Sequence, residues 1–154
     1  MPNINLETKI AAPINICFDC ARNIDLHQQS VVHTKEIAIA GRTSGLIEEG
    51  ETVTWQAVHF GVKQTLTVKI EAMVYPTYFC DVMIHGAFKS MRHEHFFVEQ
   101  NNFCVMTDKF SYTTPLGIFG KIFDKIFLEN YLRKFLLTRN NFIKAEAEKQ
   151  FRQI

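Results

Sequence analysis

The last third of the chain places the strongest constraint on its fold. Residues 91–100 (MRHEHFFVEQ) and 103–112 (FCVMTDKFSY) alternate in character from one residue to the next, as the two faces of a strand require. Pro115, Gly117 and Gly120 then interrupt the pattern, and an amphipathic stretch of about thirty residues follows. A long helix laid across a curved antiparallel sheet encloses a space between them. The sequence therefore predicts a pocket.

Upstream of these residues, the sequence predicts a strand, two short helices and then further strands joined by short turns. Residues 3–10 alternate strictly, and Pro13 suits the first position of a helix because it has no N–H to leave unpaired. Residues 41–50 hold three glycines and are expected to form a mobile loop near the mouth of the pocket. The predicted helices are 14–20 and 21–28, and the predicted strands are 3–10, 31–39, 52–60, 62–73, 78–85, 90–99 and 102–113.

The final helix is expected to run from residue 116 to residue 151. At 1.5 Å per residue it would be longer than about 50 Å, so we expect a kink near Glu129 and Asn130. The segment GIFGKIFDKIFLENYLRKF also has the pattern of a helix at a membrane surface, but Asp124 and Glu129 offset its lysines. We expect its apolar face to cover the sheet instead; that face comprises Ile118, Ile122, Phe123, Ile126, Phe127 and Tyr131.

Length and charge favour one domain, residues 1–154, with a small molecule as partner. The net charge is +1, which gives no electrostatic reason to expect a nucleic acid. No apolar stretch is long enough to span a membrane and no export signal is visible, so a cytoplasmic monomer or homodimer is expected. The 14 Phe residues against 4 Tyr and 1 Trp suit either a dense core or an apolar cavity.

The four cysteines, Cys17, Cys20, Cys80 and Cys104, are expected to be small buried hydrophobes. Cys17 and Cys20 form a C-x-x-C pair. A zinc site would need a second such pair, which the sequence lacks, and a redox site would need a thioredoxin-like order of elements. Neither chemistry is therefore predicted at this motif.

Three stretches of sequence carry a resemblance to known proteins. The first is I-x-A-P before the first helix, at Ile10 to Pro13. The second, TDKFSYTTPLGIFG at 107–120, holds Asp108, Tyr112, Pro115 and Gly117, and the third is GETVTWQAVHFG at 50–61. The chain thereby resembles the START-like helix-grip superfamily, also called SRPBCC, and within it the polyketide cyclase/dehydrase-type proteins. The third stretch is also similar to the sequences of a bacterial subgroup of small uncharacterised proteins.

The resemblance covers nearly the whole chain and implies an α+β helix-grip fold. In that fold a seven-stranded, curved antiparallel sheet wraps around the long C-terminal helix, with two short helices after the first strand and a cavity between sheet and helix. It does not imply one activity, since members bind lipids, hormones or polyketides and some are enzymes.

Strand parity places a set of polar side chains in this cavity. Trp55 and His59 share one face of strand 52–60, and His93 and His95 share one face of the strand at 90–99. Asp108 shares its face with apolar and aromatic residues, so it should also lie on the concave side. The full predicted ligand-binding set is Trp55, His59, Phe79, Met83, His93, His95, Asp108, Phe110, Tyr112, Ile118, Ile122 and Phe123.

The polar members of this set allow three interpretations. In the first, they form a hydrogen-bonded network that orients the polar end of a ligand. In the second, Asp108 and a histidine act as general acid and base, because an apolar pocket raises the pKa of a carboxylate. In the third, His93 and His95 bind a metal with Asp108 as a third ligand, because alternate residues on a strand point the same way.

The leading hypothesis is a soluble carrier or sensor of a small hydrophobic or amphipathic molecule. The alternative is an enzyme, a cyclase, dehydratase or hydrolase, that uses Asp108 and the cavity histidines on such a molecule. A third possibility is a protein-interaction module whose cavity is simply core. No cofactor and no stoichiometric metal are expected, and the sequence assigns no residue a catalytic role.

Overall fold

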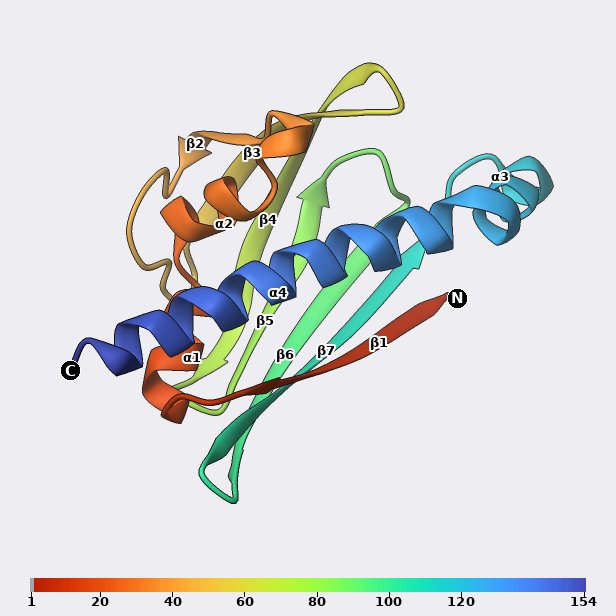
Figure 1. Ribbon diagram of the computed structural model, residues 1–154. Coiled ribbons are helices and arrows are strands. Elements are labelled where there is room, and N and C mark those ends of the chain that lie inside the picture. The colour runs from red at the N-terminus through yellow and green to blue at the C-terminus, as the bar shows by residue number, and fades with distance from the viewer. Residues whose placement is uncertain (1) are drawn as a thin grey trace.

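The computed structural model describes residues 2–154, and its organising feature is a sheet that curves around one long helix (Figure 1). The strands are β1 (Asn3–Ile10), β2 (Ile37–Gly41), β3 (Thr52–His59), β4 (Val62–Val74), β5 (Tyr78–His85), β6 (Ser90–Gln100) and β7 (Phe103–Thr113). The helices are α1 (Ile14–Ala21), α2 (Ile24–Ser30), the 3₁₀ turn η1 (Val32–Thr34), α3 (Gly117–Phe123), the π-helical segment η2 (Asp124–Leu128) and α4 (Glu129–Arg152).

All neighbouring strands are antiparallel, in the order β1-β7-β6-β5-β4-β3-β2. The meander from β3 to β7 uses short turns, a longer loop joins β2 to β3, and β1 pairs with β7 to bring the start of the chain beside its last strand. Helix α4 crosses the concave face; α1 lies beside the C-terminal part of α4, and α2 lies between α4 and the β2 edge of the sheet (Figure 1). The seven-stranded helix-grip architecture predicted from the sequence is thus confirmed.

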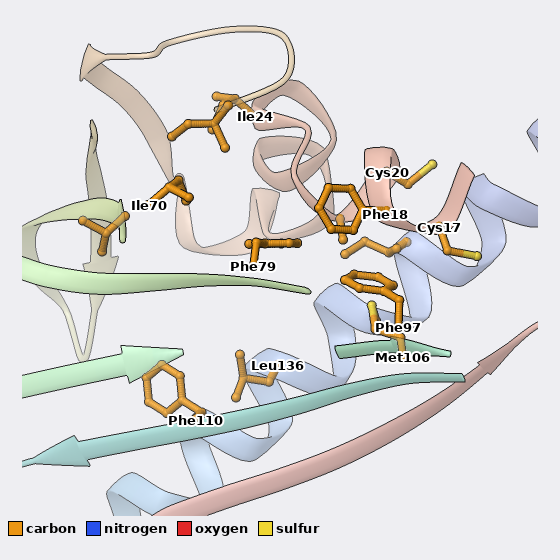
Figure 2. Close-up of a cluster of buried hydrophobic side chains, with 14 of the residues drawn as sticks. Cys17, Phe18, Cys20, Ile24, Ile70, Phe79, Phe97, Met106, Phe110 and Leu136 are labelled. Carbon is orange, nitrogen blue, oxygen red and sulfur yellow. The ribbon is translucent and has the colours of Figure 1, made fainter. Parts of the chain in front are cut away.

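The core is dense at one end of the concave face and open at the other. Phe18 of α1 packs against Phe79 and Phe97, with ring centroids 5.3 and 5.2 Å apart. Figure 2 shows this cluster beside Met106, while Phe110 stands apart from it, toward the space described below. The sheet and α4 therefore pack tightly at the α1 end and separate toward the other.

All four cysteines are free and buried, as predicted. Burial raises the pKa of Cys20 to about 12, and the neighbouring Cys104, together with burial, raises the pKa of Cys17. Cys17 Sγ contacts Ala12 O at 3.6 Å. A thiol held neutral in this way is a packing group rather than a nucleophile.

The predicted strand at 31–39 is wrong in its first half. Residues Val32–Thr34 form the turn η1, and the strand begins only at Ile37. The Thr34 hydroxyl donates to Val31 O at 2.8 Å, and Lys35 adopts a left-handed conformation with φ of 55°. This local hydrogen bond to the backbone replaces the ladder hydrogen bonds that a strand would form at these residues.

The C-terminal helix differs from the prediction in two respects. It is interrupted by η2, directly before the expected kink, so that α3 and α4 do not share one axis (Figure 1). The expected apolar face is also wrong up to residue 127, because α3 and η2 bury Gly120, Asp124 and Leu128 instead. Ile118, Ile122, Ile126 and Phe127 are exposed, and the buried residues of α4 are Leu136, Arg139, Asn140, Ile143 and Ala147.

Candidate functional site

A cavity of about 630 Å³ lies between the sheet and α4. Its walls are mostly apolar and aromatic; among them are Trp55, Phe79, Phe88, Phe110, Leu132 and Phe135. Trp55 on β3 is buried, and its ring lies 4.3 Å from that of His27 on α2. The volume and the lining are those of a site for a small organic molecule.

The cavity opens beside the turn between β3 and β4 and the start of α3. Phe60, Leu116, Phe119 and Phe123 line it and are also exposed to solvent. A residue that does both marks the rim of an opening. The predicted mouth at the loop 41–50 is therefore misplaced, since among those residues only Ile47 lines the cavity, and Ile47 is buried.

A cluster of ionisable side chains lies in the cavity wall where β5, β6 and β7 run side by side. The sheet register places Asp81 opposite His93, and His95 opposite Asp108. His93 Nε2 lies 2.7 Å from Asp108 Oδ1, and His95 Nε2 lies 3.3 Å from Asp81 Oδ1. The two imidazole rings are 3.8 Å apart between centroids, so the four groups form one connected cluster.

Helix α4 closes this cluster from the opposite side. Asn140 Nδ2 donates to Asp108 Oδ2 at 2.6 Å, and Arg139 Nη1 lies 3.8 Å from Asp108 Oδ1. Arg139 also donates to Asn140 Oδ1 and to Ala21 O, at 3.0 and 3.1 Å. Asp108 is fully buried and does not reach the cavity, whereas Asp81, His93, His95 and Arg139 line it.

The pKa shifts in the cluster follow from the balance between burial and ion pairing. Burial alone would raise the pKa values of Asp108 and Asp81, but the adjacent imidazoles outweigh it and hold both pKa values below the usual range. Burial would lower the pKa of His95, yet the two carboxylates raise it above the usual value. The pKa of His93 is lowered, by burial and by the neighbouring His95.

A second polar group lies in the cavity wall formed by β3, α2 and the segment before β2. His27 Nε2 contacts the Glu36 carboxylate, and His59 Nδ1 lies 2.6 Å from the Tyr131 hydroxyl. Burial lowers the pKa of His59. A ligand that fills the cavity thus meets polar atoms on two separate walls.

The residues that best fit a metal differ from the predicted trio. Asp81, His93 and His95 each offer one ligand atom, and these atoms lie within 4.8 Å of one another. Their donors suit a first-row transition metal. Asp108 instead has both oxygens engaged by side chains, and Arg139 brings a positive charge close to the same cluster. The absence of a stoichiometric metal stays a prediction.

The structure brings most of the predicted site residues to one cavity. Those that line it are Trp55, His59, Phe79, His93, His95, Phe110 and Phe123. Asp108 lies directly behind the lining, Met83 packs against the core, and Tyr112 is buried and donates to the Asp124 carboxylate. Ile118 and Ile122 do not line the cavity and are exposed to solvent, because this segment buries Gly120 and Asp124 instead.

The sequence interpretation missed Asp81, Arg139 and Asn140. Asp81 shares strand parity with Phe79 and Met83, which were both placed inward, so the same alternation could have found it. Arg139 and Asn140 occupy the helical stripe between Leu136 and Ile143. Polar residues in an otherwise apolar stripe are a signal for a buried network.

No known family model matches the sequence, and no curated protein matches it either. Solved structures do match over nearly the whole chain. A protein from Thermus thermophilus has a TM-score of 0.74 and 16% identity, over 95% of this chain and 99% of that one. The ZhuI aromatase/cyclase from a Streptomyces species has a TM-score of 0.72 and 13% identity, over 97% and 94%. Ginseng major latex-like protein 151 from Panax ginseng has a TM-score of 0.69 and 14% identity, over 95% and 97%.

These structures confirm the predicted resemblance to the START-like helix-grip superfamily at the level of the fold. The narrower resemblance to a bacterial subgroup stays a prediction. No helix among residues 2–154 is both long and apolar enough to cross a bilayer.

Proposed function

We propose that the protein is a carrier or sensor that encloses a small hydrophobic or amphipathic molecule between the sheet and α4. The observation that carries this proposal is the 630 Å³ cavity, whose apolar walls meet a polar cluster at one wall. Apolar walls supply affinity, and a few fixed polar groups supply orientation. The ginseng latex-like protein and the cyclase share the fold that forms such a space.

The charges in the cluster indicate a ligand whose polar end is neutral. Asp81 and Asp108 carry two negative charges, Arg139 carries one positive charge, and His95 carries a second positive charge when it is protonated. The raised pKa of His95 favours its protonated form. A charged ligand would leave one buried charge without a counter-charge, which is costly. A hydroxyl or carbonyl group would instead accept or donate hydrogen bonds without disturbing the balance.

Binding is favoured over acid–base catalysis by the state of Asp108. Both of its oxygens accept hydrogen bonds from side chains, and it is fully buried behind the cavity lining. A general acid or base must reach the proton that it transfers. Asp108 therefore positions His93, and it does not contact the enclosed molecule.

A second candidate function is an enzyme that moves protons on the same molecule. It is favoured by the His95–Asp81 pair, which lines the cavity and whose two groups have pKa values shifted in opposite directions. Pairs of this kind divide acid and base roles in active sites. The ZhuI structure is named as an aromatase/cyclase, which makes ring closure the first reaction to test.

The single tryptophan gives a direct test, because Trp55 lines the cavity. N-phenylnaphthylamine, an uncharged apolar probe, should quench Trp55 emission with a micromolar dissociation constant. Ala57→Phe, which fills part of the cavity, should weaken this binding at least tenfold. Ala145→Phe makes the same change on the exposed side of α4 and should leave it unaltered. Equal affinity of both variants would contradict the proposal.

Competition experiments then test whether the polar end of the ligand is uncharged. Decanol should displace the probe at a lower concentration than decanoate, because only decanoate adds a negative charge to a balanced cluster. Native mass spectrometry of protein purified from its own host identifies the natural molecule. The protein would instead be an enzyme if the wild type converts that molecule to a product and Asp81→Asn binds the molecule without converting it.

A further inference from the structure

The segment from Leu116 to Phe127 exposes seven apolar side chains to solvent. We call these side chains the α3 surface; they are Leu116, Ile118, Phe119, Ile122, Phe123, Ile126 and Phe127, each between 42 and 79% exposed. The buried residues of this segment are Gly120, Asp124 and Leu128 instead. A soluble amphipathic helix does the reverse and buries its apolar face.

Close packing fixes this orientation. A Cβ atom at Gly120 would lie 1.9 Å from Pro115 O, so the helix approaches the preceding turn as closely as only glycine allows. Asp124 is buried and accepts a hydrogen bond from Tyr112. Leu116 adopts a left-handed conformation with φ of 70°, which is unfavourable for leucine, and its side chain is among the most exposed. The fold holds these apolar groups outward.

The α3 surface adjoins the mouth of the cavity. Leu116, Phe119 and Phe123 belong to the α3 surface and also line the cavity. Phe60, on the turn between β3 and β4, contacts Phe123 with centroids 5.7 Å apart and extends the surface across the opening. In Figure 1, α3 lies beyond the ends of β6 and β7, at the end of the long helix.

The exposed charges on this segment are positive. Lys121 and Lys125 are exposed among the apolar residues, whereas the one acidic residue, Asp124, is buried. Lys63 follows the exposed Val62 on the neighbouring hairpin. The protein as a whole has a net charge of only +1, so these lysines are a local feature. Exposed apolar residues mixed with lysines are complementary to a negatively charged lipid surface.

We propose that the α3 surface docks on a bilayer that contains anionic phospholipid, with the cavity mouth facing the lipid. The apolar side chains insert among the acyl chains near the headgroups, and Lys121 and Lys125 contact the phosphates. Docking itself does not depend on the proposed function. Its consequence, that the enclosed molecule enters from the membrane, rests on the proposed carrier function.

Sedimentation of the full chain with vesicles tests the docking. The protein should bind vesicles of phosphatidylcholine with phosphatidylglycerol and should bind pure phosphatidylcholine much more weakly. Ile122→Asp should reduce binding at least tenfold. Val98→Asp is a matched control, because Val98 is 58% exposed against 51% for Ile122 and lies at the far end of β6. Each of Lys121→Ala and Lys125→Ala should cost about fivefold.

Two results would overturn this proposal. One is wild-type protein that fails to sediment with anionic vesicles at low ionic strength. The other is a dimer in light scattering that Ile122→Asp dissociates, which would show that a second copy covers the α3 surface. Quenching of Trp55 by N-phenylnaphthylamine without vesicles tests the cavity separately, since Ile122 does not line it. Docking and ligand binding can therefore fail independently.

Discussion

His95 lies directly opposite Asp108 in the β6–β7 ladder, and its Nδ1 atom lies 3.0 Å from Asp108 Oδ1 without forming a hydrogen bond. Within residues 2–154 it is the one buried side-chain nitrogen or oxygen that lacks a partner. The same oxygen is already engaged by His93, at 2.7 Å. Two imidazoles thus share one carboxylate oxygen, and only one of them is well aligned with it.

Asp108→Asn should destabilise the protein by about 2–4 kcal/mol. A carboxamide offers one acceptor oxygen where His93 and Asn140 each need one, and it removes the negative charge beside Arg139. Urea unfolding measures the change. Glu71→Gln is the control, because Glu71 forms an ion pair with Arg92 at the surface and should cost less than about 1 kcal/mol. Equal costs for the two variants would show that the buried network contributes little to stability.

The stability should depend on pH with opposite signs for the two cluster histidines. The folded pKa of His93 is lowered below 6.5, so its contribution is present above pH 6.5 and is lost as the pH falls through and below that value. The folded pKa of His95 is raised above 6.5, so its contribution is present below pH 6.5 and is lost as the pH rises through the raised pKa. The lowered pKa values of Asp81 and Asp108 add a further loss of stability below about pH 4.

Urea unfolding over a range of pH values separates these contributions. In His95→Gln, the decrease in stability above pH 6.5 that comes from His95 should disappear. In His93→Gln, part of the decrease below pH 6.5 should disappear instead. Identical pH profiles for wild type and His95→Gln would mean that the carboxylates do not raise the pKa of His95.

Two aliphatic residues of α4 should differ widely in how much they contribute to the stability of the fold. Ile143 is almost fully buried against the sheet, whereas Leu137 is 41% exposed. Ile143→Ala should cost about 2–5 kcal/mol, because it removes buried apolar contacts and leaves a cavity. Leu137→Ala should cost less than about 1 kcal/mol. The free energy of unfolding of each variant checks the difference, and a larger cost at Leu137 would mean that the helix is rotated.

Strand alternation and turn residues were sufficient to predict the sheet and most of the cavity. The parity of Trp55 and His59, and of His93 and His95, follows from the period of two along a strand, and all four side chains line the cavity. The partners of Asp108 on α4 could not be identified in this way. Asn140 lies 32 residues away on α4, and the rotation of that helix about its axis depends on packing.

The α3 segment shows why helical periodicity alone was misleading. Apolar residues recur at helical spacing from Ile118 to Phe127, and such a pattern usually marks the buried face. The structure buries Gly120 and Asp124 instead, because Gly120 allows close approach to Pro115 and Asp124 bonds to Tyr112. A contact between a helix and a residue on a distant strand is not visible in the period of the sequence.

The hydrogen bond between Tyr112 and Asp124 should control the mobility of the segment at the cavity mouth. Tyr112→Phe removes the hydroxyl donor from a buried carboxylate, which should cost about 1–3 kcal/mol. Without this bond, α3 and η2 retain few buried contacts, so amide hydrogen exchange in residues 117–128 should accelerate at least tenfold while that of β6 and β7 stays slow. Tyr78→Phe is the control, because its hydroxyl bonds to Glu94 at 3.0 Å, away from the mouth. Unchanged exchange at 117–128 in Tyr112→Phe would show that the close packing at Gly120 holds the segment without help from Asp124.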